Sequence, residues 1–120
     1  MKGGGHMRLN EKCFNDIMLY IEENQTSVPG IHNAPYTVKR IQLQEIIDHF
    51  KATDDKDGFS GEDIWYALTK IEEERLTKIV NMGNSLNPRS TIDDITYRGH
   101  MFLARLHAGE FRPDSSAVDA

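Results

Sequence analysis

The chain has 120 residues, 19 of them acidic and 14 basic, so its formal net charge at pH 7 is −5. This length supports one hydrophobic core but not two independent domains, and the acidic balance argues against nonspecific affinity for nucleic acid. The sequence contains neither a long apolar run nor a charged start followed by an apolar stretch, so we expect a cytoplasmic protein that is neither secreted nor inserted in a membrane.

The N-terminal segment looks foreign to the domain. MKGGGHM is typical of a short linker followed by the His-Met of a cloning site, so we expect residues 1–6 to be an expression remnant and Met7 to be the native start. The single cysteine, Cys13, cannot form an internal disulfide and has no partner motif for zinc or redox chemistry. Its place on the apolar side of a predicted helix favours a buried hydrophobic role.

Two helices and one strand are predicted in the first half. Residues 10–23 predict a helix because apolar side chains recur at helical spacing, namely Cys13, Phe14, Ile17, Met18, Tyr20 and Ile21. Residues 24–37 contain Asn, Gln, Ser, two prolines and Gly30, and they predict a loop without regular structure. Residues 38–43 alternate polar and apolar side chains, which predicts a half-buried strand that leads into a helix over 43–50.

The second half predicts two further helices around a hairpin. Ser60 provides a capping-box-like start for a helix over 60–75, with Ile64, Ala67, Leu68 and Ile71 facing inward. Residues 76–80 and 91–96 predict two strands, joined by a turn over 83–90 that we expect to have a loose tip.

The last predicted helix covers 97–107 and begins after Thr96 as its N-cap. Its spacing places Met101, Phe102 and either Leu103 or Leu106 on the inward side. The tail over 109–120 is polar, contains Pro113 and is expected to fray.

The predicted order is helix, strand, helix, helix, strand, strand, helix. This order is that of a winged helix, with the hairpin as the wing, so we expect a single α+β winged-helix domain over 7–108. The fold is a scaffold that carries many activities, so it does not by itself define a function.

Three segments of the chain, taken together, are similar to a known family. They are Met7-Arg-Leu-Asn10 with Cys13, Asp16-Ile17 and Ile21-Glu-Glu-Asn24; Phe59-Ser-Gly-Glu-Asp-Ile-Trp-Tyr66; and Ile95-Thr-Tyr-Arg-Gly-His-Met-Phe-Leu103. In these segments the chain resembles the domain-of-unknown-function family numbered 2513, short bacterial and prophage proteins. The resemblance implies a winged-helix-like fold and residence in mobile elements, but no established activity and no functional residue. Family members often end in a segment with a tryptophan, whereas this chain has Phe111 in a different context.

Two sequence patterns partly resemble metal-binding motifs. Asp55, Asp57 and Gly58 imitate half of a calcium-binding EF-hand loop, but the last ligand position falls on Ile64, which has no carboxylate. His100 and His107 are seven residues apart and can share a helical face, yet the sequence has no His-Glu-x-x-His motif. We therefore expect no metal ligand, and an acidic solvated turn before the helix over 60–75.

The motifs of common enzymes are missing. There is no Gly-x-Ser-x-Gly turn, no cysteine with an activating context and no glycine-rich phosphate loop outside residues 1–6. Glu45, Asp48 and His49 lie close together on a predicted helix, but a solvated helix face commonly has this composition. We expect a protein without cofactor or catalytic residues, which is not an enzyme.

The helix over 60–75 is the one that many winged helices insert into the major groove of DNA. Here it carries five acidic side chains against Lys70 and Arg75, namely Glu62, Asp63, Glu72, Glu73 and Glu74. Carboxylates beside phosphates lower affinity for DNA. We therefore expect a small regulatory or adaptor protein of a phage or prophage that acts through contacts with a protein partner of unknown identity. The alternative is a DNA-binding transcriptional regulator that acts as a dimer.

Outward positions of this helix and of the wing supply the candidate contacts with a partner or with DNA, which are Glu62, Tyr66, Thr69, Lys70, Glu73 and Arg89. A DNA binder would gather its positive side chains on one side, namely Lys39, Arg40, Lys70, Lys78, Arg89 and Arg98.

Trp65 is predicted either in the core, which its neighbour Ile64 favours, or beside Tyr66 in an interface. A homodimer surface is a further hypothesis for the remaining apolar residues Met18, Tyr20, Met101 and Leu103, which ordinary core packing also explains.

Overall fold

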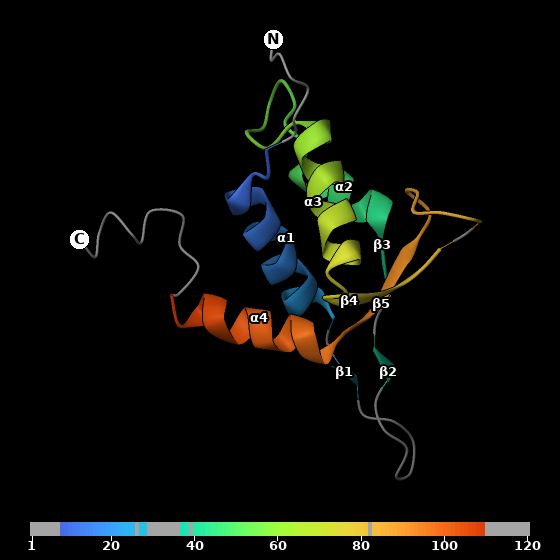
Figure 1. The fold of residues 1–120 in the computed structure, drawn as a ribbon. Helices are drawn as coiled ribbons and strands as arrows, with labels where there is room; N and C mark the ends of the chain where they lie inside the picture. Colours follow the sequence, from blue (N-terminus) through green and yellow to red (C-terminus); the bar gives the residue numbers. More distant parts are fainter. Residues whose placement is uncertain (1–7, 26, 29–36, 39, 82, 110–120) are drawn as a thin grey trace.

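The computed structural model describes residues 8–25, 27–28, 37–38, 40–81 and 83–109. In these residues the chain forms an α+β fold, as the sequence predicts. Its elements in chain order are α1 (Glu11–Asn24), β1 (Ser27–Val28), β2 (Thr37–Val38), β3 (Ile41–Gln42), α2 (Leu43–Phe50), α3 (Gly61–Glu73), β4 (Thr77–Val80), β5 (Thr91–Ile95) and α4 (Tyr97–His107). Figure 1 shows α1 and α3 side by side, with α4 running across one end of α1. None of the described helices is long and apolar enough to cross a membrane.

Three helices begin where the sequence contains a side-chain cap. A cap satisfies a backbone N–H that has no partner in the first turn of a helix. The capping bonds run from Cys13 N to Asn10 Oδ1 (3.1 Å) in α1, from Asp63 N to Ser60 Oγ (3.0 Å) in α3 and from Gly99 N to Thr96 Oγ1 (3.0 Å) in α4. The predicted starts at Ser60 and Thr96 are therefore confirmed.

Helix α2 is capped by a distant part of the chain. The N–H groups of Leu43 and Gln44 donate to the carbonyls of Ser90 and Pro88, each at 2.9 Å. Ser90 is fully buried, and its Oγ donates to Asn81 Oδ1 at 2.8 Å. The expectation of a loose tip over 83–90 is thus wrong for the second half of this turn, because its carbonyls satisfy the start of α2.

The sheet has the antiparallel order β3-β5-β4, with β5 in the centre. Ile41 of β3 pairs with Ile92, and Thr77 of β4 pairs with Ile95. The strand predicted over 38–43 is divided in the structure, because Val38 belongs to β2, Ile41 and Gln42 form β3, and Leu43 already belongs to α2.

A second, two-stranded sheet corrects the loop predicted over 24–37. β1 and β2 pair antiparallel, with Ser27 opposite Val38 and Val28 opposite Thr37. Both strands contain a β-branched residue, but the pairing joins two separate segments, so the local composition does not reveal it. Residues 29–36 of the predicted loop lie outside the described residues.

The core draws on all four helices and on the three-stranded sheet. Its buried apolar side chains are Cys13, Phe14, Ile17, Met18, Ile21, Ile41, Leu43, Ile46, Ile64, Ala67, Leu68, Ile71, Leu76, Ile92, Ile95 and Leu103. Cys13 is fully buried, as expected. Met18 and Leu103 are 0% and 1% exposed, so neither can contribute to the suggested homodimer surface.

Helix α4 presents a narrower stripe to the core than its spacing suggests. Leu103 is buried, Phe102 and Leu106 are half-buried, and Met101 is 43% exposed. The prediction that Met101 faces inward is therefore wrong. Helix α4 contacts α1 and β5, and these contacts leave Met101 exposed.

The end of α3 is tied to the start of α4. Leu76 N donates to Ile71 O at 3.1 Å and Arg75 takes a left-handed conformation with φ of 58°, which together close the helix in a Schellman motif. Thr96 N then donates to Leu76 O at 3.1 Å, and Thr96 Oγ1 donates to Arg75 O at 2.6 Å. The first turn of α4 thus lies against the C-terminus of α3.

Candidate functional site

The outward side of α3 carries a shallow hollow of about 380 Å³. Helix α3 buries one stripe of apolar side chains against α1 and α2, so positions between those of the stripe turn away from the core. The hollow is lined by Gly61, Glu62, Trp65, Tyr66 and Thr69. Three predicted contacts, Glu62, Tyr66 and Thr69, are thereby brought together. We use the name α3 face for Glu62, Trp65, Tyr66, Thr69, Lys70 and Glu73.

Trp65 combines the two roles that the sequence left open. Its half-buried side chain packs against the core, and it also lines the hollow. Thr69 Oγ1 donates to the Trp65 carbonyl at 2.9 Å, so this hydroxyl hydrogen is used within the helix. The floor of the hollow is consequently aromatic and has little polar character.

Tyr66, Lys70 and Glu73 form a row along α3. Lys70 Nζ lies 5.2 Å from the centroid of the Tyr66 ring and 3.0 Å from Glu73 Oε1. The hydrogen bond and charge of Glu73 raise the pKa of Lys70, with a smaller contribution from Tyr66. The positive charge of Lys70 is therefore engaged within α3, which leaves the acidic character of the helix dominant.

Arg89 lies on a different element from the other predicted contacts. It is exposed in the turn whose carbonyls cap α2, and its backbone N–H donates to Asn87 Oδ1 at 2.8 Å. Among the described interactions, none joins Arg89 to the α3 face. The predicted set thus divides into five residues on α3 and one beside α2.

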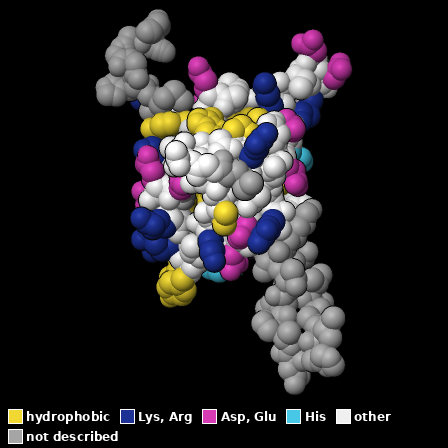
Figure 2. Space-filling model, turned by 90° about the vertical axis from the view of Figure 1, so that its right-hand side faces the viewer, with side chains coloured by type: hydrophobic (Ala, Val, Ile, Leu, Met, Phe, Trp, Pro, Cys, Tyr) yellow, Lys and Arg dark blue, Asp and Glu magenta, His cyan; other side chains and the backbone are white. Residues whose placement is uncertain are grey.

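Three of the basic residues named for a DNA binder are paired with carboxylates. Arg40 lies 3.5 Å from an Asp93 carboxylate oxygen, and Arg98 lies 3.1 Å from Glu74 Oε1, while Lys70 pairs with Glu73 as described above. Lys39 lies outside the described residues. On the face drawn in Figure 2, Lys and Arg side chains alternate with Asp and Glu side chains.

His107 and the turn with Asp55 and Asp57, which suggested metal sites in the sequence, make other contacts in the structure. In the described part of the chain, no group of three or more His, Cys, Asp or Glu side chains is arranged to hold a metal ion. His107 instead lies with Nε2 2.8 Å from Glu22 Oε1, which joins α4 to α1, and His100 is exposed. The turn with Asp55 and Asp57 is closed by backbone bonds between Ala52 and Phe59 and between Phe59 and Phe50.

Glu45 and His49 contact Tyr20 of α1. The Tyr20 hydroxyl donates to Glu45 Oε2 at 3.0 Å, and the His49 ring lies 4.4 Å from the Tyr20 ring. Burial, with the hydrogen bond and charge of Glu45, raises the pKa of Tyr20. Asp48 accepts a bond from Gln44 at 2.9 Å on the same helix. The contacts of Glu45 and His49 with Tyr20 hold α1 against α2.

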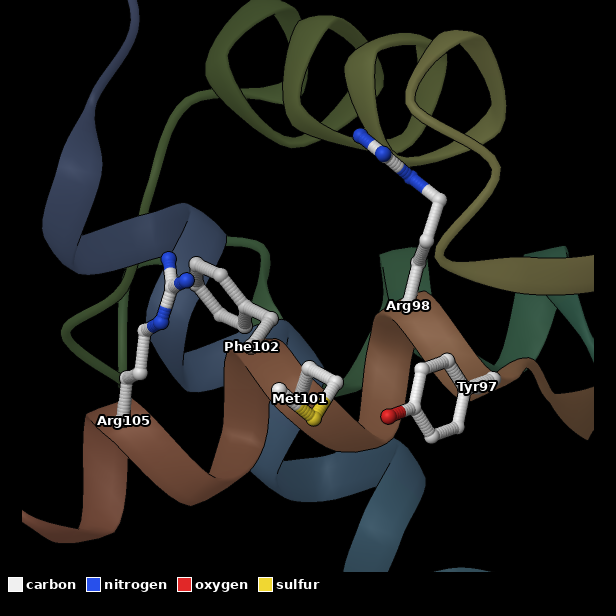
Figure 3. A pocket seen from close by; sticks show the side chains of 5 residues that line it. All are labelled: Tyr97, Arg98, Met101, Phe102 and Arg105. Carbon is white, nitrogen blue, oxygen red and sulfur yellow. The ribbon is translucent and has the colours of Figure 1, made fainter.

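A second hollow was missed by the sequence analysis. It lies on α4 and is lined by Tyr97, Arg98, Met101, Phe102 and Arg105 (Figure 3). The sequence analysis did not find this hollow because it predicted that Met101, which lines it, faces the core. The signal that could have indicated it is the composition of the helix, YRGHMFLARLH, which contains no acidic residue.

Comparison with protein-family models gave no match, and comparison with curated proteins and with solved structures gave none either.

Proposed function

We propose that the protein is a non-enzymatic adaptor or regulator that binds a protein partner through the α3 face. The observation that carries this proposal is the hollow beside Trp65 and Tyr66 with the acidic side chain of Glu62 at its edge. Aromatic side chains are enriched at the centres of protein interfaces, where they bury large areas at low entropic cost. The resemblance to the family numbered 2513 adds a phage or prophage as the expected context.

The fold that we propose for this role is a winged helix. The strand order β3-β5-β4, with α2 and α3 between β3 and β4 in the chain, supports it. In this interpretation α3 is the recognition helix and the β4–β5 hairpin is the wing. This likeness to DNA-binding folds is what favours the second candidate, a dimeric transcriptional regulator.

The charges of α3 favour a protein partner over DNA. Glu62 lies at the hollow, and Lys70 is already paired with Glu73. A phosphate backbone near this face would meet carboxylates, and each such approach lowers affinity. A protein partner with basic groups around an apolar side chain matches the same surface.

The sole tryptophan provides a direct experiment. Because Trp65 lines the hollow, a partner that covers α3 should shift its emission and protect it from quenching by acrylamide. Partners recovered by cross-linking from a cell extract should bind the wild type and Val80→Ala equally, but Tyr66→Ala at least about tenfold more weakly. Val80 is a suitable control because it is an exposed apolar residue on β4.

DNA is tested in parallel by fluorescence anisotropy with a labelled duplex of mixed sequence, from low to high salt. Under the proposal no binding occurs at low salt. Binding that weakens linearly on a log-log plot against salt would overturn the proposal and support the regulator.

A further inference from the structure

Helix α4 has two apolar stripes on opposite sides. The inner stripe packs against the core through Phe102, Leu103 and Leu106. The outer stripe consists of four exposed residues at spacings of four, three and four along the chain, namely Tyr97, Met101, Ala104 and Ala108. At about 100° per residue these four positions lie within about 60° of one another, on the side away from the core. A surface helix normally places charged and polar residues there, so the outer stripe indicates a surface that another element covers.

The outer stripe is bulky at one end and small at the other. Tyr97 is 78% exposed and Met101 is 43% exposed, and both line the hollow of about 280 Å³ on α4. Figure 3 shows their side chains next to each other on the outer side of the helix. Ala104 and Ala108 add only a methyl group each, and Ala108, the C-cap residue with φ of −78° and ψ of −4°, continues the helical path. The small half of the stripe therefore allows a bulky neighbour to approach the backbone closely.

We propose that the outer stripe of α4 binds the same stripe of a second copy of the chain, with the two helices antiparallel. A two-fold axis midway between Met101 and Ala104 places Met101 opposite Ala104 of the second copy. The same axis places Tyr97 opposite Ala108 of the second copy. Each bulky side chain then lies over a small one, and every contact occurs twice, as a two-fold interface requires. A parallel pair would set bulky against bulky and small against small, which packs poorly.

The spacing of the outer stripe also suits a helix as its partner. Alternating steps of three and four residues are those with which side chains of two helices interdigitate. Met101 is moreover one of the residues that the sequence suggested for a homodimer surface, and it is exposed where Met18 and Leu103 of that set are buried. The contact rests on apolar packing and size, and it requires no free charge on either copy.

The arginines beside the outer stripe keep their existing contacts in this arrangement. In Figure 3 Arg98 extends toward the end of α3, where its Nε donates to the Glu74 carbonyl at 2.9 Å. Arg105 extends beside the Phe102 ring. The antiparallel pair brings Arg98 toward Arg105 of the second copy, and the Glu74 carboxylate, 3.1 Å from Arg98, offsets this approach. All these side chains are exposed, so their net effect on the pair is small.

The length of α4 limits the strength of the pair. Its 11 residues span roughly 16 Å. One helix pair of this length buries less than the area of about 1,200–2,000 Å² that is typical of stable interfaces. We therefore expect a dissociation constant on the order of 100 µM. The outer stripe contains no residue of the α3 face, so the pair presents two α3 faces at once, which goes beyond the function proposed above.

The first test is sedimentation equilibrium of the full chain from about 10 µM to about 1 mM, where we expect a monomer–dimer equilibrium. Met101→Glu places a charge at the centre of the contact and should weaken the association at least about tenfold. Val80→Glu is the matched control, because Val80 is 42% exposed on β4, and it should leave the association unchanged. In a dilution series of the ¹⁵N-labelled chain, NMR shifts should change in residues 97–108 and not in residues 62–73.

The match of sizes has a test of its own. Met101→Ala removes the bulky member of the central pair and Ala104→Met crowds the small one, so each change alone should weaken the association by roughly five- to tenfold. The double variant exchanges the two sizes, and under the two-fold axis a methionine again faces an alanine. It should restore the association to within about twofold of the wild type. Alanine and methionine both favour helices, so α4 persists in all three variants.

Three results would overturn the contact between α4 helices. The first is a chain that stays monomeric at about 1 mM, which would assign the outer stripe to a different protein. The second is an association that Met101→Glu leaves intact, or that Val80→Glu weakens equally. The third is a double variant that associates no better than the single ones, because the antiparallel match of sizes is then wrong. None of these results bears on the α3 face, which is tested through Trp65.

Discussion

The side chain of Asn10 joins the first turns of two helices that are far apart in the sequence. Its Oδ1 accepts from Cys13 N at the start of α1, and its Nδ2 donates to Asp63 Oδ2 at 3.2 Å in the first turn of α3. Asp63 N is in turn bonded to the cap residue Ser60. One amide therefore caps α1 and fixes the position of the helix that carries the α3 face.

Asn10→Ala should lower the free energy of unfolding by about 1–2 kcal/mol, because it removes both the cap and the bond to a carboxylate. Urea denaturation measures this change. Asn10→Ser keeps a capping oxygen but loses the donor to Asp63, so it should lie between Ala and the wild type. Equal stability of all three proteins would contradict this role.

Gly99 is required by the close approach of α4 to the end of α3. A Cβ at this position would meet the Leu76 carbonyl oxygen and lie 2.6 Å from Ile95 Cγ2. Gly99→Ala should therefore cost more than about 2 kcal/mol, because the backbone must move. Gly61→Ala is the matched control, since its Cβ would have no neighbour within 4 Å, and it should be neutral or stabilising. Thermal unfolding followed by circular dichroism compares the two, and similar melting temperatures would contradict this role of Gly99.

Arg75 adopts a left-handed conformation, with φ of 58°, where glycine is favoured. Arg75→Gly should raise the free energy of unfolding by about 0.5–1 kcal/mol, because the strain of the Cβ outweighs the added freedom of the unfolded chain. Arg75→Ala removes the charge but keeps the Cβ, so it should bring no gain. If Ala stabilises the protein as much as Gly, the effect comes from charge and not from backbone strain. Both variants are compared with the wild type by urea denaturation.

Because its thiol is buried, Cys13 should make the free energy of unfolding fall at alkaline pH. Burial, with the charges of Asp63 and Asp16, raises its pKa from the usual 9.0 to about 12. Near pH 9 the thiol ionises only in the unfolded chain. The stability that the neutral buried thiol contributes to the folded protein is therefore complete below pH 9 and is lost between pH 9 and 12. For this one group, the free energy of unfolding falls by at most about 1.4 kcal/mol per pH unit. The raised pKa of Tyr20 acts in the same direction.

Urea unfolding at a series of pH values measures this slope. Cys13→Ala is less stable at neutral pH but should show a shallower alkaline decline. A thiol reagent such as dithionitrobenzoate should react with the wild type only as fast as the chain unfolds. Rapid reaction of the folded protein would contradict the burial of this thiol.

Glu73→Lys distinguishes the two proposed functions. The change removes the carboxylate that pairs with Lys70 and places two positive charges on the same side of α3. A basic protein partner should then bind roughly tenfold more weakly, whereas DNA would bind more tightly and with a salt slope larger by about one. Glu23→Lys makes the same reversal at an exposed position of α1 and should leave the partner complex unchanged. Unchanged binding of both ligands to Glu73→Lys would exclude α3 as the working surface.

The sequence by itself determined the four helices and the side-chain caps of three of them. Asn10, Ser60 and Thr96 act on amides three residues away, and apolar spacing reports on the helix in which it occurs, so both signals are local. The aromatic and acidic character of the α3 face could also be predicted from the sequence, because all of its residues belong to one helix.

The tertiary structure decided how much of α1 and of α4 is covered. Met18 and Leu103 are buried and Met101 is exposed because α1 and α4 meet other elements over limited areas, which spacing within one helix cannot reveal. The carbonyls of Pro88 and Ser90 cap α2 from a distant turn. Both the exposure of Met101 and this cap depend on contacts between distant segments, and such contacts exist only once the chain has packed.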